Sequence, residues 1–155
     1  MGICLKILLA FVGLTLLQVS ALRYVNPPVT ASLAWDWIQG DPSAKRYRWA
    51  YEHWRPLEEI APSLIRAVQA GEDQRFLDHH GFDFIELRKA FRDMLINRRT
   101  RGASTISMQA ARIVFLWPER TLIRKIAEAY YTILVEAFWS KGRILEVYLN
   151  TVDWG

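Results

Sequence analysis

The chain has 155 residues, which is enough for one domain of ordinary size and too short for two. Hydrophobic residues make up 52% and charged residues 23% of the sequence, a balance that excludes a disordered or low-complexity chain. The single cysteine excludes a disulfide framework, and a net charge of +4 gives only weak support for a polyanionic partner such as nucleic acid.

The first segment of the chain is apolar. Residues 7–22, between Lys6 and Arg23, carry no charge, and a helix of that length spans about 24 Å. The apolar residues before Lys6 lengthen it toward the ~30 Å of a hydrocarbon core, so we interpret residues 1–23 as a membrane anchor. A cleaved signal peptide, with a small-residue site at 19–21, is the alternative. Both interpretations place the rest of the chain outside the cytoplasm.

Residues 24–60 are interpreted as a juxtamembrane connector. They contain four of the seven tryptophans, namely Trp35, Trp37, Trp49 and Trp54. Aromatic rings beside a membrane segment often settle among lipid headgroups, but they also form ordinary hydrophobic contacts with a domain. The sequence does not choose between these two interpretations.

The periodicity from residue 61 onward is that of helices. We predict helices over residues 63–70, 84–97, 104–115, 121–139 and 142–149. The second carries apolar residues at a helical spacing: Phe84, Leu87, Phe91 and Leu95. The third is expected to begin at Ser104 as a capping residue. The longest helix is expected to bury one apolar stripe: Leu122, Ile126, Ile133 and Ala137. Because no segment alternates with the period of a strand, the sequence predicts an all-α domain behind one N-terminal transmembrane helix.

Two acidic residues, Glu72 and Asp73, follow Gly71 where the first of these helices breaks. A carboxylate at such a break can project into a cleft and act as a general base or acid. The simpler alternative is a solvated helix end. His79, taken alone, is more often a hydrogen-bonded structural residue than a catalyst.

A second candidate carboxylate, Glu128, lies one turn after Arg124 on a polar stripe that continues through Thr132 to Glu136. On spacing alone an exposed ion pair is the favoured interpretation, and it would add only a few tenths of a kcal/mol. The alternative is a carboxylate among cations that hold a phosphate.

Basic residues also gather on the second predicted helix and after it: Arg88, Lys89, Arg92, Arg98, Arg99 and Arg101. Such a group suits anionic lipid headgroups or a pyrophosphate. Nucleic acid suits it as well, but an exported domain rarely meets nucleic acid, so we set that partner aside.

Taken together, these residues resemble the family 51 glycosyltransferases, the peptidoglycan polymerases, and most of all their monofunctional biosynthetic form. Residues 72–81 match the motif E-D-x-x-F-x-x-H-x-G in full. Residues 102–109 match G-x-S-T-I-x-Q-Q with Met108 in place of the first glutamine. Residues 124–128 match R-K-x-x-E, and residues 141–150 match K-x-x-I-L-E-x-Y-L-N.

The resemblance implies a lysozyme-like helical glycosyltransferase domain over residues 61–155. Its substrates would be lipid II and the growing glycan strand, joined with inversion at the anomeric carbon. Glu72 would be the base that deprotonates the acceptor 4-hydroxyl, and Glu128 would be the second catalytic carboxylate. The substrate-binding residues implied by the resemblance are Asp73, Phe76, Ser104, Gln109, Arg112, Arg120, Arg124 and Lys125.

The resemblance also implies a setting. The protein would be a single-pass protein of the bacterial inner membrane, with its catalytic domain on the periplasmic side. Membrane lipid and other proteins of cell wall synthesis and division would be its partners, and nucleic acid would not. Some relatives place a divalent cation, Mg²⁺ or Mn²⁺, on the pyrophosphate, but no metal-ligand cage is evident in this sequence.

The family continues beyond its fourth motif, whereas this sequence stops at Gly155, so we expect the domain to be incomplete at its C-terminus. Two alternatives therefore stand beside the polymerase. One is an inactive membrane protein that binds lipid II. The other is a lysozyme-like glycan hydrolase, which would share the helical fold and the carboxylate chemistry.

Overall fold

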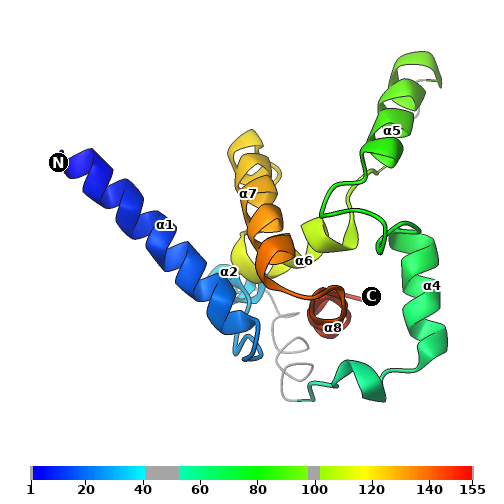
Figure 1. Ribbon diagram of the computed structural model, residues 1–155, viewed down its shortest axis with the longest axis horizontal. Helices are drawn as coiled ribbons and strands as arrows, with labels where there is room; N and C mark the ends of the chain where they lie inside the picture. The colour runs from blue at the N-terminus through cyan, green and yellow to red at the C-terminus, as the bar shows by residue number, and fades with distance from the viewer. Residues whose placement is uncertain (1, 41–52, 98–101, 155) are drawn as a thin grey trace.

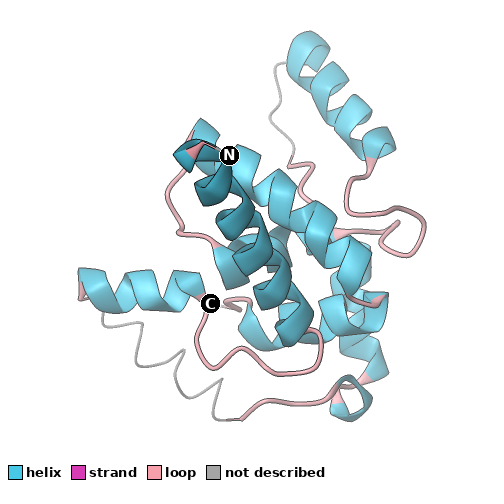
Figure 2. Ribbon diagram, turned by 60° about the vertical axis from the view of Figure 1, so that its left-hand side comes forward, coloured by secondary structure: helices cyan, strands magenta, loops and turns pink. Residues whose placement is uncertain are grey.

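The structure is a computed structural model that describes residues 2–40, 53–97 and 102–154. Its described residues form helices and no strand, so the all-α prediction is confirmed. In chain order the elements are α1 (Ile3–Leu22), α2 (Ala31–Gln39), the 3₁₀ turn η1 (Leu57–Glu59), α4 (Pro62–Glu72), α5 (Phe84–Asn97), α6 (Ile106–Phe115), α7 (Leu122–Phe138) and α8 (Lys141–Thr151). Figures 1 and 2 show their arrangement.

The predicted helices of the domain are all present, with boundaries that differ by at most two residues. The third one, α6, begins after Thr105 rather than at Ser104, so the predicted cap was wrong by one residue. The Thr105 hydroxyl accepts a hydrogen bond from the Met108 amide and donates one to the Gly81 carbonyl, 2.6 Å away. Thr105 therefore caps the helix and ties it to the preceding loop.

Helix α2 was not predicted, because the segment was interpreted as a connector. Its ends nevertheless carry ordinary signals in the sequence. The Thr30 side chain accepts from the Leu33 amide at the N-terminus, and Gly40 takes a left-handed conformation, with φ of 70°, at the C-terminus.

The core lies around α6, which packs against both α7 and α8. Two fully buried alanines, Ala110 and Ala111, allow these neighbours to approach closely. Phe115 stacks on Tyr131 of α7, with ring centroids 4.5 Å apart. On α8, Ile144 and Val147 are fully buried in the same cluster. The central position of α6 explains why its flanking segments can bring distant parts of the chain together.

The apolar N-terminal helix α1 is attached to the domain along its second half. The Thr15 hydroxyl lies 2.7 Å from the Tyr130 hydroxyl on α7, and Trp139 donates from its indole nitrogen to the Val19 carbonyl. Arg143 on α8 donates to the carbonyl of Leu22, which satisfies the end of the helix. The first half of α1 extends away from the other helices (Figure 1). Among the described residues, α1 is the one helix long and apolar enough to cross a membrane.

Polar residues of α8 hold the segment that precedes η1. The Glu146 carboxylate accepts from the indole of Trp54 and from the backbone amide of Leu57. The Asn150 side chain exchanges two hydrogen bonds with the backbone of Arg55. Trp54 therefore belongs to a contact with the domain, as one of the two interpretations held. Trp37 is half-exposed on α2, and Trp49 lies outside the described residues.

The longest helix, α7, contradicts the prediction of its buried stripe. Leu122, Ile126 and Ile133 are 78%, 64% and 58% exposed, and Ala137 is exposed as well. The polar stripe is the buried one: Arg124, Glu128 and Thr132 all face the interior. Helix α5 projects from the rest of the structure (Figure 1), and Ala90 is the one buried residue among those of its side chains that the structure describes. The helical spacing of Phe84, Leu87, Phe91 and Leu95 correctly predicted the helix, and these four side chains are exposed.

The polar stripe of α7 can be buried because its groups satisfy one another. The Glu128 carboxylate is 1% exposed and accepts from Arg124 Nη1 at 2.5 Å and from Lys125 Nζ. The interpretation of this pair as an exposed surface pair was therefore wrong. One turn further, Thr132 donates to the Glu128 carbonyl, and Glu136 accepts from Lys141. Each buried charge thus has a partner, which offsets its desolvation.

We predict that Gly81→Ala destabilises the protein, whereas Gly71→Ala does not. Gly81 has φ of 89°, and a Cβ there would lie 2.8 Å from Thr132 Cγ2 and 3.0 Å from Glu136 Cγ. Strain and overpacking together should cost about 2 to 4 kcal/mol. Gly71 lies within α4 and has open space around its added Cβ. Denaturant unfolding in detergent, followed by circular dichroism, measures both, and equal stability of the two variants would contradict the close approach of the loop to α7.

We also predict that Glu128→Gln lowers the free energy of unfolding by about 3 to 5 kcal/mol, because it leaves a buried guanidinium without its counter-charge. Glu59→Gln is the matched control, since Glu59 pairs with Arg55 four residues away in a solvent-exposed ion pair. The control should lose at most about 1 kcal/mol. A similar small loss in both variants, measured by the same unfolding experiment, would show that the Glu128 pair is not buried.

Candidate active site

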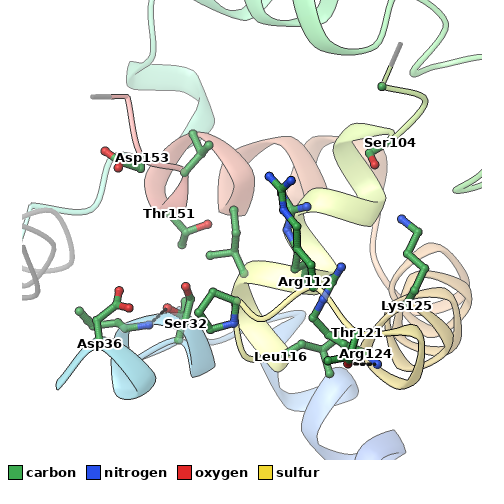
Figure 3. A pocket seen from close by; sticks show the side chains of 17 residues that line it. Ser32, Asp36, Ser104, Arg112, Leu116, Thr121, Arg124, Lys125, Thr151 and Asp153 are labelled. Carbon is green, nitrogen blue, oxygen red and sulfur yellow. Dashed lines mark hydrogen bonds between the residues drawn. The ribbon is translucent and has the colours of Figure 1, made fainter. Parts of the chain in front are cut away.

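A cavity of about 860 Å³ lies where α2, α6, α7 and the end of α8 meet. Four cations predicted to bind substrate line it: Arg112, Arg120, Arg124 and Lys125. Asp36 and Asp153 lie on the opposite side, with Arg112 between them and the α7 residues (Figure 3). The cavity therefore has one strongly cationic wall, which suits a ligand with more than one negative charge.

A second cavity, of about 260 Å³, lies beside the first and contains Glu72. Gly102 and Ser104 line both cavities, so the segment before α6 is their common wall. The sequence prediction that Ser104 belongs with the cations and with Glu72 thus agrees with its position. A reacting group held near Ser104 would have the carboxylate on one side and the cations on the other.

The last residue of α4, Glu72, projects from the end of its helix, as expected. Its Oε2 accepts a hydrogen bond of 2.9 Å from the Gln109 side-chain amide on α6. Gln109 in turn lies 3.5 Å from the hydroxyl of Tyr148 on α8, with its Oε1 as the acceptor. Three helices thus contribute one residue each to a chain of hydrogen bonds that ends on the candidate base.

Tyr148 is a site residue that the sequence reasoning did not assign. Burial, reinforced by the nearby Glu72 carboxylate and opposed by Arg112, raises the pKa of Tyr148 to about 12. The phenol therefore keeps its proton near neutral pH and acts as the donor to Gln109, which fixes the orientation of that amide. The sequence could have indicated this role, because a tyrosine on the buried face of a helix usually has a hydrogen-bond partner for its hydroxyl.

The Asp73 carboxylate is buried and turned toward the protein. His79 Nε2 lies 3.0 and 3.1 Å from its two oxygens, and the Ile106 amide at the start of α6 donates to Oδ2. His79 is thus a hydrogen-bonded structural residue, as its isolated position in the sequence indicated. Asp73 links the loop after Glu72 to the first turn of α6, which keeps Glu72 beside Gln109.

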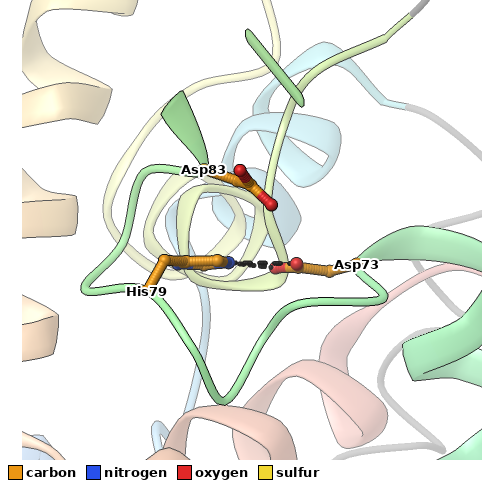
Figure 4. A group of neighbouring side chains, drawn as sticks. All are labelled: Asp73, His79 and Asp83. Atoms are coloured by element: carbon orange, nitrogen blue, oxygen red, sulfur yellow. Dashed lines mark hydrogen bonds and ion pairs between the residues drawn. The ribbon is translucent and has the colours of Figure 1, made fainter. Parts of the chain in front are cut away.

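Asp83 completes a group of three buried side chains with Asp73 and His79 (Figure 4). Their ligand atoms lie within 4.8 Å of one another, which is a spacing that metal ions accept. Protein donors already occupy these carboxylates, since Asp83 accepts from the amides of Ile85 and Glu86. Burial opposes the ionisation of Asp83, but these amides and a nearby guanidinium outweigh it and hold the pKa of Asp83 below its ordinary value.

This group does not fit a divalent cation that bridges to a pyrophosphate. Asp73 and Asp83 line the smaller cavity and His79 lies outside it, whereas the cations that would meet a pyrophosphate line the larger one. Arg75 lies 3.3 Å from Asp83 Oδ2, and a fixed positive charge at that distance opposes a metal ion. We therefore derive no catalytic step through a metal.

Three predicted site residues are outside the lining of both cavities: Gln109, which binds Glu72, Phe76 and Glu128. Phe76 is buried in the core, and the Lys141 ammonium lies 4.4 Å from the centre of its ring. Glu128 lies behind the cationic wall, where it binds Arg124 and Lys125. Of the predicted basic group after residue 87, Arg88, Lys89 and Arg92 are exposed on α5. Arg98, Arg99 and Arg101 lie outside the described residues.

Comparison with known proteins gives consistent matches. The Transglycosylase family matches residues 39–155. A biosynthetic peptidoglycan transglycosylase of Caulobacter vibrioides is 40% identical over 154 residues, which is 99% of this chain and 64% of that protein. A protein of the same name from Pseudomonas aeruginosa is 42% identical, and the match covers 97% of this chain and 64% of that protein. Another from Bacteroides thetaiotaomicron is 44% identical, and the match covers 97% of this chain and 60% of that protein.

The chain thus spans about three fifths of the length of the curated relatives that it matches. The matches extend across the cavities, Glu72 and the cationic wall, and the resemblance predicted from the four motifs is confirmed. The chain belongs to the transglycosylase family.

Proposed function

We propose that this chain carries the glycosyl-transfer site of a peptidoglycan glycosyltransferase, which polymerises lipid II into glycan strands with inversion at the donor carbon. The observation that supports this most is the common wall at Ser104. It sets a carboxylate, Glu72, next to a cavity with four cations. A transfer from a sugar pyrophosphate needs both a base for the acceptor and positive charge for the leaving group.

In this proposal Glu72 takes the proton of the acceptor 4-hydroxyl as that oxygen attacks the anomeric carbon of the donor. The bond from that carbon to the pyrophosphate oxygen breaks, and the lipid pyrophosphate leaves with the electron pair. Gln109 holds the carboxylate in place through its 2.9 Å hydrogen bond. Because the amide donates to Oε2, the other carboxylate oxygen is left to face the acceptor.

The cations act on the donor. Arg112, Arg120, Arg124 and Lys125 surround the position of the pyrophosphate and neutralise the charge that develops as it leaves. Glu128 acts through two of them, since its carboxylate binds Arg124 and Lys125 and so fixes their direction. We therefore assign Glu128 as a positioning residue.

The proposed setting is the bacterial inner membrane, with α1 crossing it once and the domain on the periplasmic side. Its length of 20 residues and its mean hydropathy of 2.1 support a crossing. A lipid-linked donor and a growing glycan strand would then meet the site at the membrane surface. A glycan hydrolase has no use for four cations around a leaving group, so the geometry favours the polymerase over that alternative.

We expect Glu72→Gln to lower lipid II polymerisation by a factor of about 10² to 10⁴, because an amide keeps the shape of the side chain but accepts no proton. Glu59→Gln, which changes an exposed carboxylate outside both cavities, should leave the rate unchanged. The assay follows glycan chain formation in a form of the protein that polymerises lipid II. Near-parental synthesis by the Glu72 variant would show that another group is the base.

We expect Arg120→Ala to weaken the binding of a short-chain prenyl diphosphate by about 1.5 to 3 kcal/mol, roughly 10- to 150-fold, through loss of a charge-assisted contact. Arg120 lines the cavity and forms no ion pair with a described carboxylate, so its removal should affect binding without destabilising the fold. The matched control is Arg66→Ala, an exposed arginine on α4 outside both cavities. Calorimetric titration at fixed ionic strength measures both. Equal affinities would place the diphosphate elsewhere.

A further inference from the structure

We propose that Tyr148 on α8 is a positioning residue for glycosyl transfer, because its hydroxyl holds the Gln109 amide with its N–H group toward Glu72. The inference rests on the proposed role of Glu72 as the base. Tyr148 is 2% exposed and lines neither cavity, so it acts through Gln109 and not on the substrate.

Glu72 needs such support because of its place in the fold. It is the last residue of α4, and its side chain is exposed. An exposed glutamate adopts many rotamers, whereas a general base must be held within hydrogen-bond reach of the proton that it takes. The hydrogen bond of 2.9 Å from Gln109 Nε2 restricts this carboxylate to one position beside α6.

Gln109 can support the base in only one orientation. Its amide has a donor nitrogen and an acceptor oxygen of nearly the same size, so a half-turn about the last bond exchanges the two without changing the shape of the side chain. With Nε2 toward Glu72, the amide donates to the carboxylate. After a half-turn, Oε1 would face the carboxylate oxygens, and the base would lose its donor.

The Tyr148 hydroxyl favours the donating orientation. It lies 3.5 Å from Gln109 Oε1, and Gln109 is its one hydrogen-bond partner among the described residues. Burial raises the pKa of Tyr148 to about 12, so the hydroxyl keeps its proton and needs an acceptor. A half-turn of the amide would remove that acceptor and leave a buried hydroxyl hydrogen without a partner, which is unfavourable.

Tyr148 is itself held firmly, as a positioning residue must be. It belongs to the core cluster, and its ring meets that of Trp154 edge to face, with centroids 6.4 Å apart. Its helix packs against α6, which carries Gln109. The hydroxyl therefore has a fixed place relative to the amide. Their separation of 3.5 Å is long for a hydrogen bond, and hydrogen bonds of active sites often shorten when the substrate binds.

The test measures kcat and KM for lipid II in the assay used for Glu72→Gln. Tyr148→Phe removes the hydroxyl and keeps the ring in the core. Gln109→Met removes the amide and keeps the length of the side chain, and a double variant combines the two changes. Tyr131→Phe is the matched control, because Tyr131 is buried in the same core and takes no part in the chain of hydrogen bonds to Glu72. Circular dichroism checks the helix content of every variant, and Tyr148→Met replaces Tyr148→Phe if that variant does not fold.

We expect Tyr148→Phe to lower kcat by roughly 2- to 10-fold, the factor that corresponds to one neutral hydrogen bond, with KM unchanged. Tyr131→Phe should keep the parental kcat. Because the hydroxyl acts through Gln109, adding Tyr148→Phe to Gln109→Met should cause no further loss. An equal loss in both backgrounds would overturn the inference, because it would mean that the hydroxyl serves only the fold.

A parental kcat of Tyr148→Phe, or a change in KM alone, would also overturn the inference. Glu72 would remain the base in either case, as long as Glu72→Gln lowers polymerisation as expected. Near-parental synthesis by Glu72→Gln would instead overturn the proposed base and the positioning role with it. The two failures are therefore distinguishable.

Discussion

The burial of the Glu128 carboxylate is the constraint on which the rest of the structure depends. A carboxylate with 1% exposure is stable inside a protein only if positive charge comes with it, and here Arg124 and Lys125 supply that charge. Both belong to α7, so the requirement fixes the rotation of the whole helix about its axis. The polar stripe faces inward, and Leu122 and the three isoleucines of the helix face outward.

This rotation has consequences at both ends of the molecule. At one end it aims Arg124 and Lys125 into the large cavity, where they stand opposite the wall that Ser104 shares with the Glu72 cavity. On the other side it presents Tyr130 to α1, and Arg143 completes the attachment by binding carbonyls at the end of α1. One helix therefore relates the catalytic groups to the apolar anchor, which matters for an enzyme whose proposed donor is held in a membrane.

Much of this arrangement was predictable from the sequence, and the exceptions have physical reasons. Helix boundaries followed from caps and periodicity, and Glu72 projected from a helix end as its neighbours indicated. The buried face of α7 was predicted wrongly because hydrophobicity takes no account of a charge that is buried with partners, as Glu128 is with Arg124 and Lys125. The relay from Tyr148 through Gln109 was missed because it joins three helices, and no local pattern reports a contact between residues 39 positions apart.

The most direct test of the central constraint is a double-mutant cycle on Arg124→Met and Glu128→Leu, measured by unfolding in detergent. If the two charges are buried together, Glu128→Leu leaves the Arg124 guanidinium unpaired and loses about 3 to 5 kcal/mol, and Arg124→Met loses less because Lys125 still pairs with Glu128. The double variant replaces the pair with apolar groups, so its loss should be clearly smaller than the sum of the two single losses. Losses that simply add, with no coupling between the two positions, would contradict the account, because they would mean that Arg124 and Glu128 are solvated independently.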